Sequence, residues 1–215
     1  MKNKILLIGG GGHCRVILDT LSSDRKYLVA GIIDVQQKVG LKIFETSVIG
    51  TEKDLAKYHK AGIKDCFISM GSVGDPKLRV KFYRLAKRIG FSFPNIISPL
   101  ATVSKRASFG EGNFIAPGVI INAGTVISDN CIINTGAIIE HDCIIDNFVH
   151  IAPGVVLSGG VEIGQYSHIG TGSIVIQGIK IGANAVIGAG SLVVEDIKSK
   201  VIAYGSPCKP RNKNG

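Results

Sequence analysis

The sequence predicts a chain in two parts: a small Rossmann-like α/β domain over residues 1–97, followed by a coil of short parallel strands over residues 98–215. In the second part an apolar residue, aliphatic at every position except Phe109, recurs every six positions between Ala101 and Asp196 without an insertion. The first part instead alternates apolar runs with segments of helical spacing. A helix cannot produce a six-residue apolar period, and hairpins would need loops of varied length. The second part is therefore expected to be a solenoid.

Each six-residue unit carries a second signal. Three residues after the aliphatic position, thirteen of sixteen units have Gly, Asn or Asp, and the exceptions are Arg106, Phe148 and Tyr166. These three residue types tolerate a positive φ, so this position is expected to form a turn, and Asp196 is expected to mark the last one. The next residue is small or β-branched, which suits packing inside a tight corner.

The first part reads as a strand at Lys4–Ile8, a turn of four glycines, and a helix. The other expected elements are strands at 27–34, 66–71 and 91–97 and helices at 51–61 and 76–89. Backbone N–H groups in a glycine turn before a helix can bind a diphosphate, although such a turn can also bind nothing. The GxGxxG fingerprint fails, because Cys14 occupies the position of the third glycine, which disfavours a dinucleotide-binding oxidoreductase.

The bulk composition favours a cytoplasmic enzyme-like protein. No uninterrupted apolar run is long enough for a membrane span, and the apolar start is too short for a signal peptide. Five cysteines without a CxxC pair predict small buried hydrophobic residues and no metal site. The net charge of +9 suits anionic ligands such as phosphates, and the absence of a known motif argues against nucleic acid as a partner.

The motifs GGGGHCRVI, GIID and SMG, with the linker NIISPLATVS before the repeats, resemble the hexapeptide-repeat family of bacterial sugar O- and N-acetyltransferases. This family includes the sialic-acid O-acetyltransferase and the UDP-4-amino-sugar N-acetyltransferase of bacillosamine synthesis. The likeness covers essentially the whole chain, although Ser98-Pro99 replaces the frequent His-Pro. It implies a left-handed parallel β-helix of triangular section with three six-residue units per coil, and a homotrimer with active sites between subunits.

The resemblance also implies the ligand-binding residues. His150 contacts acetyl-CoA near the thioester, and backbone N–H groups near Gly159, Thr171 and Ala189 meet the thioester and the pantetheine arm. Lys209 or Arg211 meets the CoA phosphates, unless the basic tail is frayed. The residues expected to bind the nucleotide-sugar are Gly11, Gly12, His13, Asp34, Val35 and Gly71.

Glu140-His141-Asp142 is the candidate catalytic group. Acetyl transfer needs a base for the proton of the attacking amine or hydroxyl, and histidine titrates near working pH. A neighbouring carboxylate would fix the tautomer of the ring. The family motif makes His141 the base and Asp142 its partner, with Glu140 as the alternative. His150 and His168 are separated by one full coil, so they should stack on adjacent turns, and His168 is expected on the surface.

The leading hypothesis is an acetyl-CoA-dependent N-acetyltransferase that acts on a nucleotide-linked 4-amino-sugar (UDP-, dTDP- or GDP-linked) by direct transfer. The glycine turn and the positive charge favour an acceptor that carries a nucleotide. O-acetylation of sialic acid or a related sugar is the alternative on the same scaffold. A non-catalytic scaffold that only binds a nucleotide-sugar is the third hypothesis.

Overall fold

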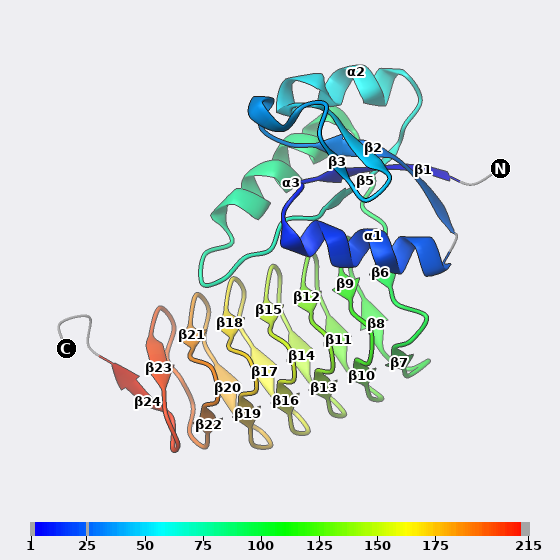
Figure 1. Ribbon diagram of the computed structural model, residues 1–215. Coiled ribbons are helices and arrows are strands. Elements are labelled where there is room, and N and C mark those ends of the chain that lie inside the picture. Colours follow the sequence, from blue (N-terminus) through cyan, green and yellow to red (C-terminus); the bar gives the residue numbers. More distant parts are fainter. Residues whose placement is uncertain (1–2, 25, 212–215) are drawn as a thin grey trace. The chain divides into compact units, whose positions relative to one another are not determined.

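The computed structural model describes residues 3–24 and 26–211, and the chain forms two compact units. The first unit comprises the chain up to Ser72 together with Lys77–Pro99. The second comprises Val73–Pro76 and the chain from Leu100 onward. The fold class expected from the sequence, an α/β domain followed by a left-handed parallel β-helix, is confirmed (Figure 1).

The first unit is built on a five-stranded sheet with the order β3-β4-β2-β1-β5, in which only β3 runs antiparallel to its neighbour. Its strands are β1 (Asn3–Ile8), β2 (Tyr27–Ile33), β3 (Lys42–Ile43), β4 (Thr46–Gly50) and β5 (Asp65–Ile68), and β6 (Ile96–Ile97) follows later. The helices are α1 (Gly12–Asp24), α2 (Leu55–Lys60) and α3 (Lys77–Ile89), with the short 3₁₀ helices η1 (Gln36–Lys38) and η2 (Glu52–Asp54).

Helices cover both faces of this sheet (Figure 1). α2 and α3 pack on one face, where Leu55 and Ala86 join Leu6, Ile8 and other buried residues in one core cluster. α1 lies on the other face and buries its own apolar side chains, Ile17 among them. The β3–β4 hairpin was not predicted, because residues 36–50 carry neither a clear apolar period nor a Gly-rich turn.

The second unit winds through three faces (Figure 1). Successive strands of a face pair in parallel, as β10 does with β13, except that β24 runs antiparallel to β23. Face 1 holds β7 (Thr102–Val103), β10 (Ile120–Ile121), β13 (Ile138–Ile139), β16 (Val156–Leu157), β19 (Ile174–Val175) and β22 (Leu192–Val193). Face 2 holds β8 (Ser108–Phe109), β11 (Val126–Ile127), β14 (Ile144–Ile145), β17 (Glu162–Ile163) and β20 (Lys180–Ile181). Face 3 holds β9 (Phe114–Ile115), β12 (Ile132–Ile133), β15 (His150–Ile151), β18 (His168–Ile169), β21 (Val186–Ile187), β23 (Ile202–Tyr204) and β24 (Lys209–Arg211).

The corners follow the predicted register. The second residue of each strand from Ile115 to Val193 is at most 2% exposed, so one aliphatic side chain fills the interior at every rung. Phe148 and Tyr166, exceptions in the sequence pattern, nevertheless adopt the left-handed conformation with φ of 57° and 65°. Asp196 does not adopt it, so that prediction is wrong. The last coil is two residues shorter, since Ile197 pairs with Ile181, and Lys200 takes the left-handed position.

Candidate functional site

His141 and Asp142 form the turn between β13 and β14, on the edge that joins faces 1 and 2 (edge 1–2). Asp142 has a φ of 58°, and its Oδ2 lies 2.9 Å from Nδ1 of His141. Both side chains are exposed, that of His141 at 65% and that of Asp142 at 71%. An imidazole that donates its Nδ1 proton to a carboxylate keeps a lone pair on Nε2. Because the His141 side chain is exposed, this nitrogen is a potential base.

Glu140 is held elsewhere. Its Oε2 accepts a hydrogen bond of 3.0 Å from Nδ2 of Asn122, the residue at the same corner position one coil earlier. Of the two acids beside His141, the structure thus pairs Asp142 with the imidazole. Asn122 was missed by sequence reasoning, although its position one full coil before Glu140 is a signal that could have identified it.

Gly159 lies directly against the catalytic candidate. It occupies the turn one coil after His141, and the N–H of Gly160 donates to the His141 carbonyl at 2.8 Å. A Cβ on Gly159 would stand 2.5 Å from Nε2 and 2.6 Å from Cε1 of His141, closer than real Cβ atoms approach. The imidazole can occupy this place only because residue 159 has no side chain.

Thr171 and Ala189 lie on a different edge, the one that joins faces 3 and 1 (edge 3–1), one coil apart. No described residue accepts a hydrogen bond from the backbone N–H of Thr171, Ala189 or Gly159, so these three donors can serve a ligand. Lys209 lies in β24, where its Nζ is 3.3 Å from Oε1 of Glu195. The expected cofactor residues are therefore distributed over two edges of one chain.

His150 and His168 stack on face 3 as the spacing predicted. They are register partners in β15 and β18, and their ring centroids are 4.8 Å apart at an interplanar angle of 67°. The prediction that His168 is a surface residue is wrong, because only 9% of it is exposed. Burial lowers the pKa of His168, whose Nδ1 has no partner among residues 3–24 and 26–211. Burial thus favours the neutral form of the His168 imidazole.

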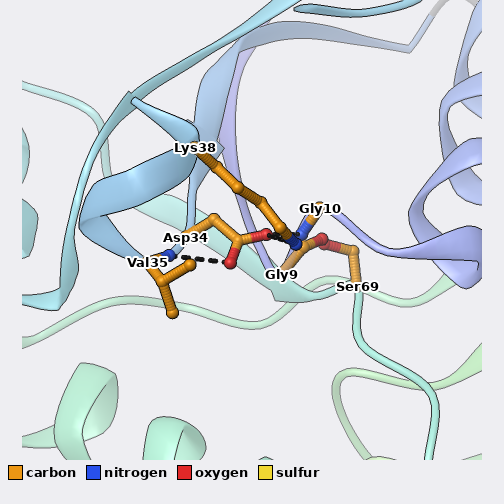
Figure 2. A network of polar contacts seen from close by, with 6 residues as sticks. All are labelled: Gly9, Gly10, Asp34, Val35, Lys38 and Ser69. Atoms are coloured by element: carbon orange, nitrogen blue, oxygen red, sulfur yellow. Dashed lines mark hydrogen bonds and ion pairs between the residues drawn. The ribbon is translucent and has the colours of Figure 1, made fainter. Parts of the chain in front are cut away.

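The second candidate site centres on Asp34 at the carboxyl end of β2 (Figure 2). Its Oδ2 accepts hydrogen bonds from the Gly10 N–H at 2.6 Å and from Lys38 Nζ at 2.9 Å, and its Oδ1 accepts one from the Val35 N–H at 2.7 Å. Burial opposes ionisation, but these three hydrogen bonds outweigh it and hold the pKa of the Asp34 carboxyl below its usual value. Sequence reasoning missed Lys38, which follows Asp34 closely in the chain.

The glycine turn opens at a switch point of the sheet. β2 and β5 flank β1 on opposite sides, so the connections that follow β1 and β5 run in different directions and leave a crevice beyond these strands. Gly11, Gly12 and Gly71 are exposed there, and a Cβ on Gly71 would touch Cβ of His13 at 3.7 Å. His13 in the glycine turn and Gly71 after β5, both predicted to bind the substrate, are thus neighbours.

A cavity of about 510 Å³ lies beside Asp34 and Val35, at the carboxyl ends of β1, β2, β4 and β5. Its apolar wall includes Ile33, Met70 and Phe82, and its rim carries polar groups such as Lys53 and Lys81. An apolar slot with a few polar groups has the character of a small-molecule site. The sequence placed only Asp34 and Val35 here, because the other lining residues come from distant segments.

Comparisons with known proteins agree with this arrangement. Residues 4–85 match the family model of the PglD N-terminal domain, and residues 124–159 match that of the bacterial transferase hexapeptide (six repeats). No curated protein shows a significant sequence match to the chain. The fold and the exposed histidine–carboxylate pair thus define a hexapeptide-repeat transferase.

Two solved structures are similar over nearly the full length. The H141N variant of perosamine N-acetyltransferase from Caulobacter crescentus, in complex with CoA and GDP-perosamine, is 36% identical with 98% of each chain covered and a TM-score of 0.93. The acetyltransferase domain of PglB from Neisseria gonorrhoeae FA1090, in complex with acetyl coenzyme A, is 34% identical, covers 98% of this chain and 100% of that chain, and has a TM-score of 0.89. The chain belongs to this left-handed β-helix family of sugar N-acetyltransferases, as the motifs had indicated.

None of the helices within residues 3–24 and 26–211 combines the length and the apolar character that crossing a membrane requires. The five cysteines are all buried, and none of them forms a disulfide within the part of the chain that the structure describes.

The Asp34 network predicts a specific pH dependence of stability. Asp34→Asn removes a carboxylate that accepts three hydrogen bonds, so the free energy of unfolding at pH 7 should fall by about 1–3 kcal/mol. Because the folded-state pKa is depressed, the wild type holds this stabilisation above about pH 4 and loses it as the pH falls through the folded pKa. Urea denaturation from pH 7 down to pH 3 measures both effects.

Asp19→Asn, on the exposed side of α1, is the matched control, and it should change the free energy of unfolding by less than about 0.5 kcal/mol. Equal effects of the two substitutions would show that the Asp34 network does not stabilise the domain.

Proposed function

We propose that this chain is an acetyl-CoA-dependent N-acetyltransferase that acetylates the amino group of a nucleotide-linked 4-amino-sugar. The observation that carries the proposal is the exposed His141–Asp142 pair on a β-helix corner, in a chain 36% identical to an enzyme solved with CoA and GDP-perosamine. Two complexes of that relative have a histidine replaced by asparagine or alanine. This supports a histidine as the base.

In the proposed reaction, the sugar amine attacks the carbonyl carbon of the thioester. Nε2 of His141 accepts the proton that the nitrogen loses, and Asp142 stabilises the imidazolium through Nδ1. The carbonyl oxygen becomes an oxyanion in the tetrahedral intermediate, and a free corner N–H such as that of Gly159 can donate to it. When the intermediate collapses, the C–S bond breaks, and the CoA thiolate leaves and takes the proton.

The two domains divide this work. Residues 1–97 hold the nucleotide-sugar, with the diphosphate at the glycine turn before α1 and the nucleoside in the cavity beside Asp34 and Val35. Residues 98–215 bind acetyl-CoA and carry out the transfer. A cytoplasmic location fits five cysteines that form no disulfide within the described residues, since an oxidising compartment favours disulfides.

A homotrimer would complete the site. The outward residues of face 1 from β10 to β22 are Ile120, Ile138, Val156, Ile174 and Leu192, an aliphatic row that includes exposed side chains. Face 1 lies between edge 1–2 and edge 3–1. If face 1 of three copies turns toward a common axis, edge 1–2 of each copy meets edge 3–1 of the next. His141 and Gly159 then face Thr171 and Ala189 of a neighbouring copy across one cleft.

His141→Ala tests the catalytic assignment. Loss of a general base should lower kcat by a factor of about 10²–10⁴ without changing the melting temperature. The measurement is CoA release from acetyl-CoA with a panel of UDP-, dTDP- and GDP-linked 4-amino-sugars. His59→Ala, in α2, is the control. Wild-type rates for the His141 variant would disprove the catalytic assignment. Inactivity of the wild type toward the whole panel would favour a scaffold that only binds a nucleotide-sugar. Acetylation of sialic acid by the wild type instead would indicate an O-acetyltransferase.

Gly159→Ala tests whether the missing side chain positions the base. The added Cβ must displace the imidazole, so kcat should fall by about 10-fold or more, while KM for the nucleotide-sugar stays nearly constant. Gly136→Asn is the control, since an added Cβ there meets no atom within 4 Å and asparagine tolerates the left-handed turn. A rise only in KM for acetyl-CoA would mean that Gly159 contacts the cofactor and does not position His141.

Ile174→Arg tests the trimer. A charge on face 1 should shift the protein from trimer to monomer in sedimentation equilibrium, because an unpaired cation cannot be buried at an apolar interface. Ile144→Arg on face 2 is the control, because the exposed fraction of Ile144 (48%) is nearly equal to that of Ile174 (45%). The variant on face 2 should stay trimeric, and dissociation of that variant alone would place the interface on face 2.

A further inference from the structure

The positive charge of the chain is concentrated in one part of the first unit. Residues 51–90 carry ten Lys and Arg and four Asp and Glu, a net charge of +6 out of +9 for the whole chain. The cations are spread along the sequence, but the structure gathers them in α2 and α3 and in the segments beside them. Neither helix contains an Asp or Glu.

α2 and α3 contact each other in one layer on the same face of the sheet (Figure 1). Their apolar side chains, such as Tyr58, Phe82 and Leu85, pack against the core. Arg79 of α3 is buried as well, and the other Lys and Arg residues of the two helices are exposed. We call the surface that these exposed residues form the basic face, and its members outside the nucleotide cavity are Lys57, Lys60, Lys77, Arg84, Lys87 and Arg88.

The two acids just before α2 do not neutralise the basic face. Glu52 forms its ion pair with Lys81 at 3.1 Å, and both residues line the nucleotide cavity. Asp54 accepts hydrogen bonds from the backbone N–H and the hydroxyl of Thr51 and so caps the start of its own helix. With ten Lys and Arg against four Asp and Glu in residues 51–90, the basic face carries an excess of positive charge.

We propose that the basic face docks the protein reversibly on an anionic lipid surface. A bilayer that contains acidic phospholipids is flat and carries charge over its whole area, which suits two helices lying side by side. The major groove of a nucleic-acid duplex admits a single helix, so this paired layer cannot enter it.

The docking is electrostatic and therefore weak, additive and sensitive to salt. Each Lys or Arg held near an anionic membrane strengthens binding by a factor of roughly five. Replacing four of them should weaken partitioning at least about 100-fold. Because the basic face excludes the charged residues that line the nucleotide cavity, docking and acetyl transfer can be measured separately, and the proposal does not depend on the proposed reaction.

Co-sedimentation of the full chain with vesicles tests the proposal. One set of vesicles contains phosphatidylcholine alone, and the other contains phosphatidylcholine with phosphatidylglycerol. The test variant carries Lys57→Glu, Lys60→Glu, Arg84→Glu and Arg88→Glu. The matched control carries the same change of charge at exposed positions of the second unit: Lys105→Glu, Arg106→Glu, Lys198→Glu and Lys200→Glu.

The wild type and the control variant should sediment with the anionic vesicles and not with the neutral ones, and the test variant should remain in solution. Binding of the wild type should disappear between about 0.1 M and about 1 M NaCl, as the Debye length falls from about 10 Å to about 3 Å, and this result requires no folded variant. The proposal fails if the wild type ignores anionic vesicles, if both variants lose binding equally, or if a DNA duplex at the same phosphate concentration removes the protein from the vesicles.

Discussion

The structure depends on the parallel pairing of each short strand with the strand one coil further along the chain. This pairing places one fully buried aliphatic side chain at each rung and fixes the spacing of everything on the outside. Some corner side chains point to solvent, as those of His141 and Asp142 do, so the chain can place a titratable group there without cost to the interior. His141 and Asp142 use this freedom, and Gly159, one coil further on, provides the space that the imidazole occupies.

The corners also show how strongly neighbouring coils dictate conformation. Phe148 and Tyr166 are bulky residues in the left-handed region, a conformation that costs roughly 1–2 kcal/mol for a residue with a Cβ. The stacked rungs before and after each corner impose it regardless of residue type, and the two rings stack with centroids 5.8 Å apart. Register pairing thus overrides local preference at these positions.

The first unit uses a different constraint, a single carboxylate that connects two strand ends. Asp34 accepts hydrogen bonds from the turn after β1, from its own following residue and from Lys38. These contacts fix the glycine turn relative to β2, at the edge of the sheet where the cavity beside Asp34 opens.

The sequence by itself determined the β-helix, its coil of three six-residue units, the pairing of His150 with His168 and the glycine turn before the first helix. The six-residue repeat and the glycine turn follow from local patterns, whereas the family resemblance supplied the number of units per coil. A coil of fixed length then converts spacing along the chain directly into position. The family motifs added the identity of the chemistry. Only the tertiary structure decided which acid contacts His141, how deeply His168 is buried, the β3–β4 hairpin and the shorter last coil. It also placed Gly159 on one edge of the coil and Thr171 and Ala189 on another, because such positions depend on contacts between segments that no local pattern links.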